Sequence, residues 1–224
     1  MGTDTLIDHF GVILVSFWGT VRLAVTAGLW SAALGLVVAL MRVSPVPALR
    51  AAGTLYVTVL RNTPLTLVLL FCGLGLGATL DVHFSRDDLS MDNFWLAIVG
   101  LSCYTSAFVC EALRAGVNTV PRGEIEAARS IGLTFTQTAR LVVLPQALRA
   151  VIAPLGSIVI ALTKNTTVVY VVGYLEASRQ MKLLFDEDGA SVQVFAGFAL
   201  GFMVLTIPAG LVFGRLARRL AVSR

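Results

Sequence analysis

The sequence has few charged residues for its length. Only 13% of its 224 residues are Asp, Glu, Lys or Arg, whereas 57% are apolar. An ordinary soluble domain has about 25% charged residues. This deficit argues against a soluble protein and indicates a chain that lies largely within a membrane. The three cysteines, an odd number, all lie inside apolar runs, which is neither a disulfide framework nor a metal-ligand spacing.

Motifs for catalysis and for nucleotide binding are also absent. The sequence contains no GxxxxGK[ST] loop, which would hold ATP phosphates, and no HExxH or GxSxG motif. The apolar runs contain no Ser/His pair, paired Asp or metal-ligand cluster. We therefore expect no catalytic residue, no metal site and no cofactor bound by this chain, and nothing points to nucleic acid.

Long apolar runs dominate what is present. A helix of about 20 apolar residues crosses the hydrocarbon layer of a membrane. We predict an all-α, polytopic membrane protein that forms one transmembrane domain over residues 1–224. Its five transmembrane helices lie at about residues 21–41, 53–77, 93–115, 151–173 and 192–214.

The segment before the first run has its own pattern. Apolar residues recur at three- and four-residue spacing from Leu6 to Trp18, which is typical of a short helix lying in the outer membrane interface. The alternative is that this segment simply extends the first span.

The distribution of cations predicts the orientation. Arginines gather between spans one and two, between spans three and four, and in the C-terminal tail, whereas most aspartates lie in the opposite segments. By the positive-inside rule, the arginine-rich segments are cytoplasmic. The N-terminus is then outside and the C-terminus inside a cell membrane, which an odd number of spans satisfies.

The cytoplasmic segment between spans three and four, at about residues 121–145, carries a specific motif. It reads Glu126-Ala127-Ala128, then Gly132 and, nine residues after the glycine, an aliphatic residue followed by Leu144-Pro145. This spacing resembles the EAA loop of permease subunits in binding-protein-dependent ABC importers. In that family the loop forms a coupling helix that docks on the cytoplasmic ATPase, so the resemblance implies a fold of the type I importer class and an ATPase-coupling role for these residues.

Further segments narrow the resemblance to the polar amino acid permeases. They include RNTPL at 61–65, PQALR at 145–149 and KNTT at 164–167, and RNTPLTLVLLFC at 61–72 is similar to permeases of actinobacterial glutamate importers. The resemblance implies an amino acid import subunit, with glutamate as the expected substrate. The implied partners are a cytoplasmic ATP-binding subunit dimer that holds ATP and Mg²⁺, a second permease chain that is homologous but different, an extracellular substrate-binding protein and membrane lipid.

Two cations inside the predicted spans suggest where the substrate passes. Arg61 and Lys164 lie near mid-membrane, where an unpaired charge costs about 2.5–3.5 kcal/mol, and surplus positive charge suits a carboxylate. Polar neighbours lie beside each of them, so the predicted substrate path consists of Arg61, Asn62, Thr63, Lys164, Asn165, Thr166 and Thr167. Many relatives have Asp where Asn165 stands, which favours Glu, Asp or Gln over a cationic substrate. The alternative is structural: Arg61 pairs with Glu111, and Lys164 caps carbonyls at a helix kink.

Two further questions stay open at this level. A self-sufficient, ion-coupled secondary transporter or channel is the competing function, but it more often needs intramembrane carboxylates, and Glu111 is the one candidate. On the outside, the charged segment from Glu176 to Asp188 is either a solvated loop or a docking surface for the binding protein.

Overall fold

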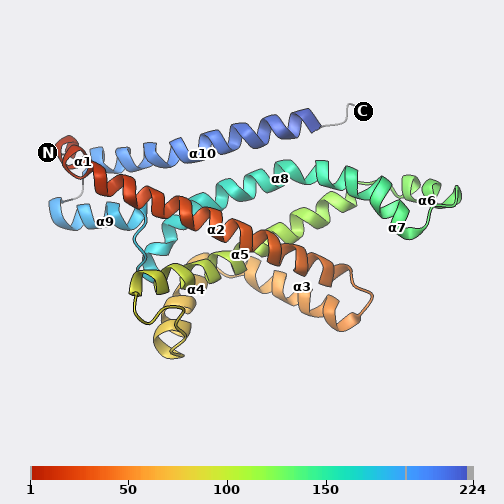
Figure 1. Ribbon diagram of the computed structural model, residues 1–224, viewed down its shortest axis with the longest axis horizontal. Helices are drawn as coiled ribbons and strands as arrows, with labels where there is room; N and C mark the ends of the chain where they lie inside the picture. Colours follow the sequence, from red (N-terminus) through yellow and green to blue (C-terminus); the bar gives the residue numbers. More distant parts are fainter. Residues whose placement is uncertain (1, 190, 221–224) are drawn as a thin grey trace.

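The computed structural model describes residues 2–189 and 191–220, and within these ranges it contains helices and no strand. The all-α prediction is confirmed. Four long helices run along the longest axis of the molecule (Figure 1): α2 (Phe10–Val43), α5 (Leu89–Asn118), α8 (Leu144–Asn165) and α10 (Val192–Leu220). Four stretches are long and apolar enough to cross a membrane, and a bent helix pair makes up to five in the described part of the chain.

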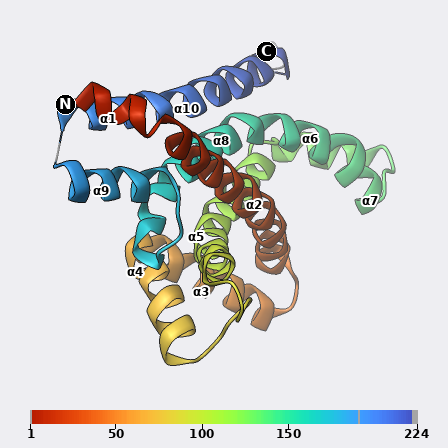
Figure 2. The same ribbon diagram turned by 60° about the vertical axis from the view of Figure 1, so that its left-hand side comes forward.

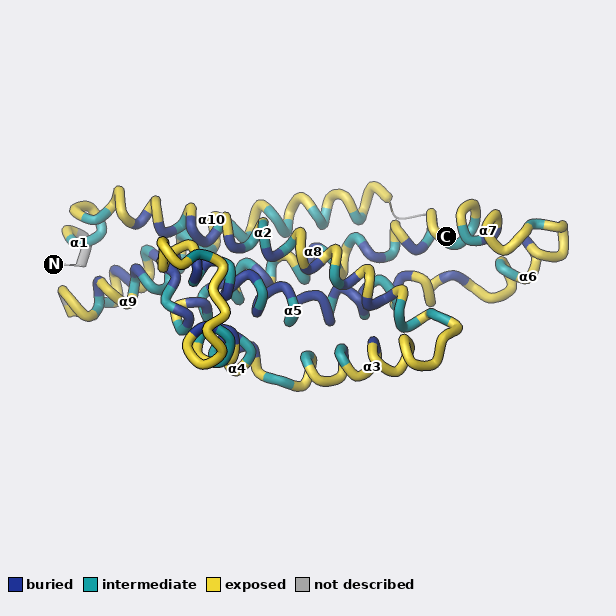
Figure 3. The backbone as a smooth tube through the Cα atoms, turned by 60° about the horizontal axis from the view of Figure 1, so that its bottom comes forward, coloured by how far each residue is buried: buried dark blue, intermediate teal, exposed yellow. Residues whose placement is uncertain are grey.

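Helix α5 lies at the centre of the bundle. Within its most apolar part 67% of the residues are buried, against 33% in α2 and 11% in α10, and the tube in Figure 3 is darkest along α5. Close approach to α8 depends on Gly116, where an added Cβ would lie 2.2 Å from Cγ1 of Val151. The outer helices keep apolar faces exposed, as lipid-facing helices do.

The N-terminal segment differs from the prediction of one separate helix over residues 6–18. A short helix, α1 (Gly2–Asp8), ends before His9, and the residues from Phe10 onward belong to the 34-residue helix α2. Only Arg22 is charged between residues 10 and 41, so nothing interrupts the helix there. For residues 10–20 the alternative prediction is correct, because these residues extend the first apolar helix.

The predicted second span is broken. Helix α3 (Pro47–Asn62) is followed by α4 (Leu65–Leu70) and by a π-helical turn, η1 (Phe71–Thr79), and the two halves meet at an angle of 107°. Pro64 lacks the N–H that would continue the helix, and it favours the extended conformation at Thr63, where φ is −100° and ψ is 132°. Figure 2 shows the second half turning away from α3.

The predicted fourth span also changes character along its length. Helix α8 gives way to a 3₁₀ helix, η3 (Thr166–Val172), which ends at Gly173 with a φ of 91°. Helix α9 (Ala177–Asp188) follows and packs against α2 and α10 at the end of the molecule that also holds α1 (Figures 1 and 2). The opposite end is formed by the 121–145 loop, with α6 (Arg122–Ser130) and α7 (Phe135–Thr138).

Candidate translocation path and coupling loop

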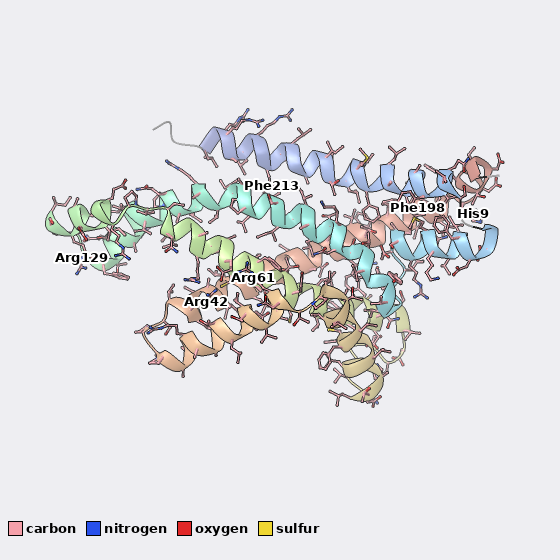
Figure 4. All side chains as sticks on the ribbon, turned by 180° about the vertical axis from the view of Figure 1, so that it is seen from behind. His9, Arg42, Arg61, Arg129, Phe198 and Phe213 are labelled. Atoms are coloured by element: carbon pink, nitrogen blue, oxygen red, sulfur yellow. The ribbon has the colours of Figure 1, made fainter. Side chains whose placement is uncertain are left out.

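Three arginines surround one carboxylate where α2, α3 and α5 meet. Glu111 on α5 accepts a hydrogen bond from Arg42 of α2, and its Oε1 lies 3.6 Å from Arg114 Nη1 and 3.9 Å from Arg61 Nη1. Figure 4 shows Arg42 and Arg61 close together. The exposed fraction of the side chain is 13% for Arg42 but 47% for Arg61. Arg42 is therefore the direct partner of Glu111, and Arg61 keeps an accessible guanidinium.

The accessible side of this cluster opens into a hollow of about 320 Å³. We call it the arginine hollow; it is lined by Arg42, Val57, Thr58, Arg61, Asn62 and Glu111. Asn62 uses its Nδ2 to donate to the carbonyl of Thr58, and Thr63 donates to the carbonyl of Val59. These side chains thus bond carbonyls at the end of α3.

A second hollow of about 300 Å³ lies between α5 and α8. We call it the threonine hollow; it is lined by Tyr104, Thr105, Phe108, Ser157, Ile158, Ala161, Leu162 and Asn165. The Thr105 hydroxyl is buried and has no hydrogen-bond partner among the described residues. Arg61 lies over the Phe108 ring, 5.8 Å from its centroid. Phe108 therefore lies between Arg61, which lines the arginine hollow, and the threonine hollow.

The four residues of the 164–167 motif take different positions. Asn165 lines the threonine hollow. The Lys164 side chain is exposed and makes no hydrogen bond or ion pair with the described residues. Thr166 is buried and donates to the carbonyl of Thr163, and Thr167 donates to the carbonyl of Lys164. The threonines therefore bond the backbone where α8 becomes 3₁₀.

These positions test the two structural roles that were the alternative to substrate binding: pairing of Arg61 with Glu111, and capping of carbonyls by Lys164. Arg61 does approach Glu111, but at a longer distance than Arg42, which bonds it. At the α8 kink, threonine hydroxyls bond the carbonyls, so the proposed capping by Lys164 is wrong.

Sequence reasoning missed Thr105 and Phe108 as lining residues, and it placed Arg42 simply with the cytoplasmic cations. Arg42 is 69 positions from Glu111 along the chain, and no local pattern links them. Among the described residues, no group of three His, Cys, Asp or Glu side chains could hold a metal ion.

In the 121–145 loop, Gly132 follows the end of a helix. The N–H of Leu133 donates to the carbonyl of Ala128, and the N–H of Gly132 donates to that of Arg129. This is the Schellman pattern, which places a left-handed residue just after the helix. Gly132 has a φ of 87°, a conformation that glycine adopts without steric cost. Gly132 thus sets where α6 ends.

A second helical turn follows at once. Thr134 and Gln137 form a reciprocal capping box at the start of α7. The turn between α6 and α7 presents two apolar side chains, Ile131 and Phe135, that are 80% and 83% exposed. Glu124 accepts a hydrogen bond from Gln146, which ties α6 to the start of α8. Exposed apolar side chains on a capped turn are suited to contact with another protein.

The six residues predicted for coupling divide between this loop and α8. Glu126 and Ala127 are exposed on α6, whereas Ala128 is buried and faces the protein. Leu144 and Pro145 form the first turn of α8, after a short π-helical segment, η2 (Ala139–Val143). Figure 4 shows Arg129, on α6, far from Arg42 and Arg61. The loop and the two hollows are therefore separate sites on one chain.

The opposite end of the molecule has two buried carboxylates with defined roles. Asp92 accepts hydrogen bonds from the N–H groups of Phe84 and Ser85 and bonds Nδ1 of His83 at 2.7 Å. This bond raises the pKa of His83. Glu176 caps α9 by accepting from the N–H groups of residues 178 and 179, and burial raises its pKa to about 7.

Comparisons with known proteins agree with this architecture. The profile of the family described as "Binding-protein-dependent transport system inner membrane component" matches residues 12–222. The chain is 49% identical over 217 residues to the glutamate transport system permease protein GluC of Corynebacterium efficiens, with 95% of each chain covered. It is 36% identical over 223 residues to the probable glutamine ABC transporter permease protein GlnM of Bacillus subtilis, with full coverage of both.

Solved structures share the fold. An amino acid ABC transporter crystallised with histidines has a chain that superposes with a TM-score of 0.87 at 26% identity, covering 96% of both chains. The methionine transporter MetNI, in an inward-facing conformation, gives a TM-score of 0.75 at 18% identity, which shows the fold alone. The chain belongs to the family of inner membrane components of binding-protein-dependent transport systems and is a multi-pass membrane permease subunit.

Proposed function

We propose that this permease subunit forms the path for glutamate in an ATP-driven importer. The observation that carries the proposal is the surplus of cations around Glu111, where Arg42 supplies the direct bond and Arg61 stays accessible to a hollow. An anionic substrate can compensate that charge inside the membrane, where leaving it unpaired is costly. The similarity to glutamate transport permeases supports the same substrate class.

The two hollows suggest how a dicarboxylate amino acid is held. The guanidinium group of Arg61 is planar and can donate two parallel hydrogen bonds to one carboxylate. Thr105 has a buried hydroxyl without a partner among the described residues, and Asn165 offers both a donor and an acceptor. Asn165 is neutral, so it does not favour a cationic side chain. Lys164 is exposed beside it and adds positive charge to the path.

The partners follow from family membership. We infer that the exposed apolar pair Ile131 and Phe135, together with Glu126 and Ala127, docks on a cytoplasmic ATPase dimer that binds ATP and Mg²⁺. A second permease chain completes the path, and an extracellular binding protein delivers the substrate to the end that holds α9. In this orientation the N-terminus is outside and the C-terminus is cytoplasmic. ATP hydrolysis belongs to the partner, and this chain is not an enzyme.

Uptake by the reconstituted importer tests the substrate path. Proteoliposomes holding the whole complex are loaded with ATP and given binding protein and labelled glutamate. We expect Arg61→Ala to lower the initial uptake rate by at least tenfold, whereas Thr66→Ala, at an exposed position on α4, leaves the rate within about twofold. Equal rates in the two variants would contradict a role for Arg61 in substrate passage.

A further inference from the structure

A third hollow lies at the end of the bundle that adjoins the 121–145 loop. It has a volume of about 330 Å³ and is formed where α2 and α5 end and α8 begins. We call it the inner groove. Apolar side chains make up most of its wall, and several are about half exposed: Leu36, Leu40, Val117, Leu144 and Leu148.

The charged residues that line the inner groove are both cationic. Arg42 and Arg114 are among its lining residues, and no Asp or Glu is. Both guanidinium groups turn toward the same carboxylate, Glu111, which Arg61 also approaches. A single negative charge cannot neutralise three positive ones. The wall of the groove therefore carries uncompensated positive charge next to a long apolar surface.

We propose that the inner groove binds an anionic phospholipid of the membrane leaflet on that side. The phosphate would lie against Arg114 and Arg42, because guanidinium groups bond phosphate oxygens strongly and in pairs. An acyl chain would lie along Leu36, Leu40 and Leu148. Basic pockets between transmembrane helices at the cytoplasmic side are suited to anionic headgroups. Only the assignment to the cytoplasmic leaflet rests on the orientation in the proposed function.

The position of the groove favours lipid over a peptide or a soluble anion. Apolar helices end here, so headgroups and acyl chains meet at this level of the molecule. A free phosphate would gain nothing from the apolar wall, and an apolar helix would leave the arginines without a counter-charge. A phospholipid with net negative charge can pair its headgroup with the arginines and pack an acyl chain against the apolar wall.

Photo-crosslinking of lipid tests the proposal. The purified importer complex is placed in phosphatidylcholine nanodiscs with a small fraction of phosphatidylglycerol that carries a diazirine in one acyl chain. A parallel sample carries the same diazirine on phosphatidylcholine. After illumination, mass spectrometry measures labelling of the peptides that contain Val117 and Leu148. We expect several-fold more labelling by phosphatidylglycerol than by phosphatidylcholine.

Variants distinguish recognition of the lipid's charge from the space available in the groove. Arg114→Gln should remove the preference for phosphatidylglycerol, Arg114→Lys should keep most of it, and Arg50→Gln, at an exposed arginine outside the groove, should leave it unchanged. Val117→Trp, which narrows the groove, should lower labelling by both lipids. Equal labelling by the two lipids, no effect of Arg114→Gln, or no label in the groove would each overturn the proposal. The assay needs neither substrate nor ATP, so a wrong substrate assignment does not affect it.

Discussion

At the scale of single residues, the positive charges around Glu111 outnumber the negative ones. Glu111 is bonded by Arg42 and approached by Arg61 and Arg114. In a soluble protein, water would screen the surplus, but in a membrane the surplus must be met by a ligand, a lipid or a water-filled cavity. Both the proposed substrate path and the proposed lipid site follow from this one imbalance.

Gly132 offers a test of the coupling loop at this scale. Alanine at a φ of 87° is strained, and the cost is about 1 kcal/mol. We expect Gly132→Ala to loosen the end of α6, so that the complex still assembles but substrate-stimulated ATP hydrolysis falls several-fold.

The matched control is Gly123→Ala. Gly123 is helical, and an added Cβ there meets no atom within 4 Å, so this variant should retain wild-type coupling. Full coupling in both variants would argue against the role assigned to the helix end.

Glu176 predicts a pH dependence of stability. Burial raises its folded pKa to about 7 from an ordinary value of 4.5. The folded state thus holds the proton more tightly than the unfolded state, and the stabilisation is complete below about pH 4.5 and is lost as the pH rises through about 7. The melting temperature of the wild type should therefore fall relative to that of Glu176→Gln between pH 5 and pH 8.

The exposed Glu187 gives the control for this experiment. Glu187→Gln should follow the wild type at every pH, because an exposed carboxyl is solvated in both the folded and the unfolded state. A constant difference in melting temperature between the wild type and Glu176→Gln across this pH range would contradict burial of an ionisable carboxyl at the α9 cap.

At the scale of elements, the architecture depends on where helices are interrupted or end as well as on the helices themselves. Pro64 predicts the interruption between α3 and α4, and Gly132 predicts the end of α6, because each residue has a backbone constraint that the sequence states directly. The 107° bend, however, depends on packing of the second half against α5 and η3. That packing involves residues far apart in the chain, so its angle could not be predicted from the local sequence.

The segment between η1 and α5 supplies a prediction for an element. Asp92 is 2% exposed and bonds two backbone N–H groups and His83. Asp92→Asn removes the charge that strengthens these bonds, at a cost of about 1–3 kcal/mol. We expect trypsin to cut the purified complex after the exposed Arg86 several-fold faster in this variant.

Asp87→Asn is the control, since Asp87 is exposed and makes no hydrogen bond with the described residues. Its cleavage rate should match that of the wild type. If Asp92→Asn also matches the wild type, Asp92 does not hold the segment in place.

At the scale of the whole molecule, composition predicted most of the architecture. Long apolar runs predicted an all-helical membrane protein, and the spacing around Glu126 and Gly132 predicted the family. The contents of the hollows were harder to predict. Phe108, Thr105 and Arg42 lie among ordinary apolar or basic residues in the sequence, and only the packing of α2, α3, α5 and α8 brings them to the two hollows.

The most direct test of the central claim is uptake of labelled glutamate under defined energy sources. Proteoliposomes containing this permease, its partner permease, the ATPase and the binding protein should accumulate glutamate only when ATP and Mg²⁺ are present, and excess aspartate should compete better than arginine. Proteoliposomes with the permease chain alone should show no uptake under a proton or sodium gradient. Gradient-driven uptake by this chain without the ATPase would contradict the account.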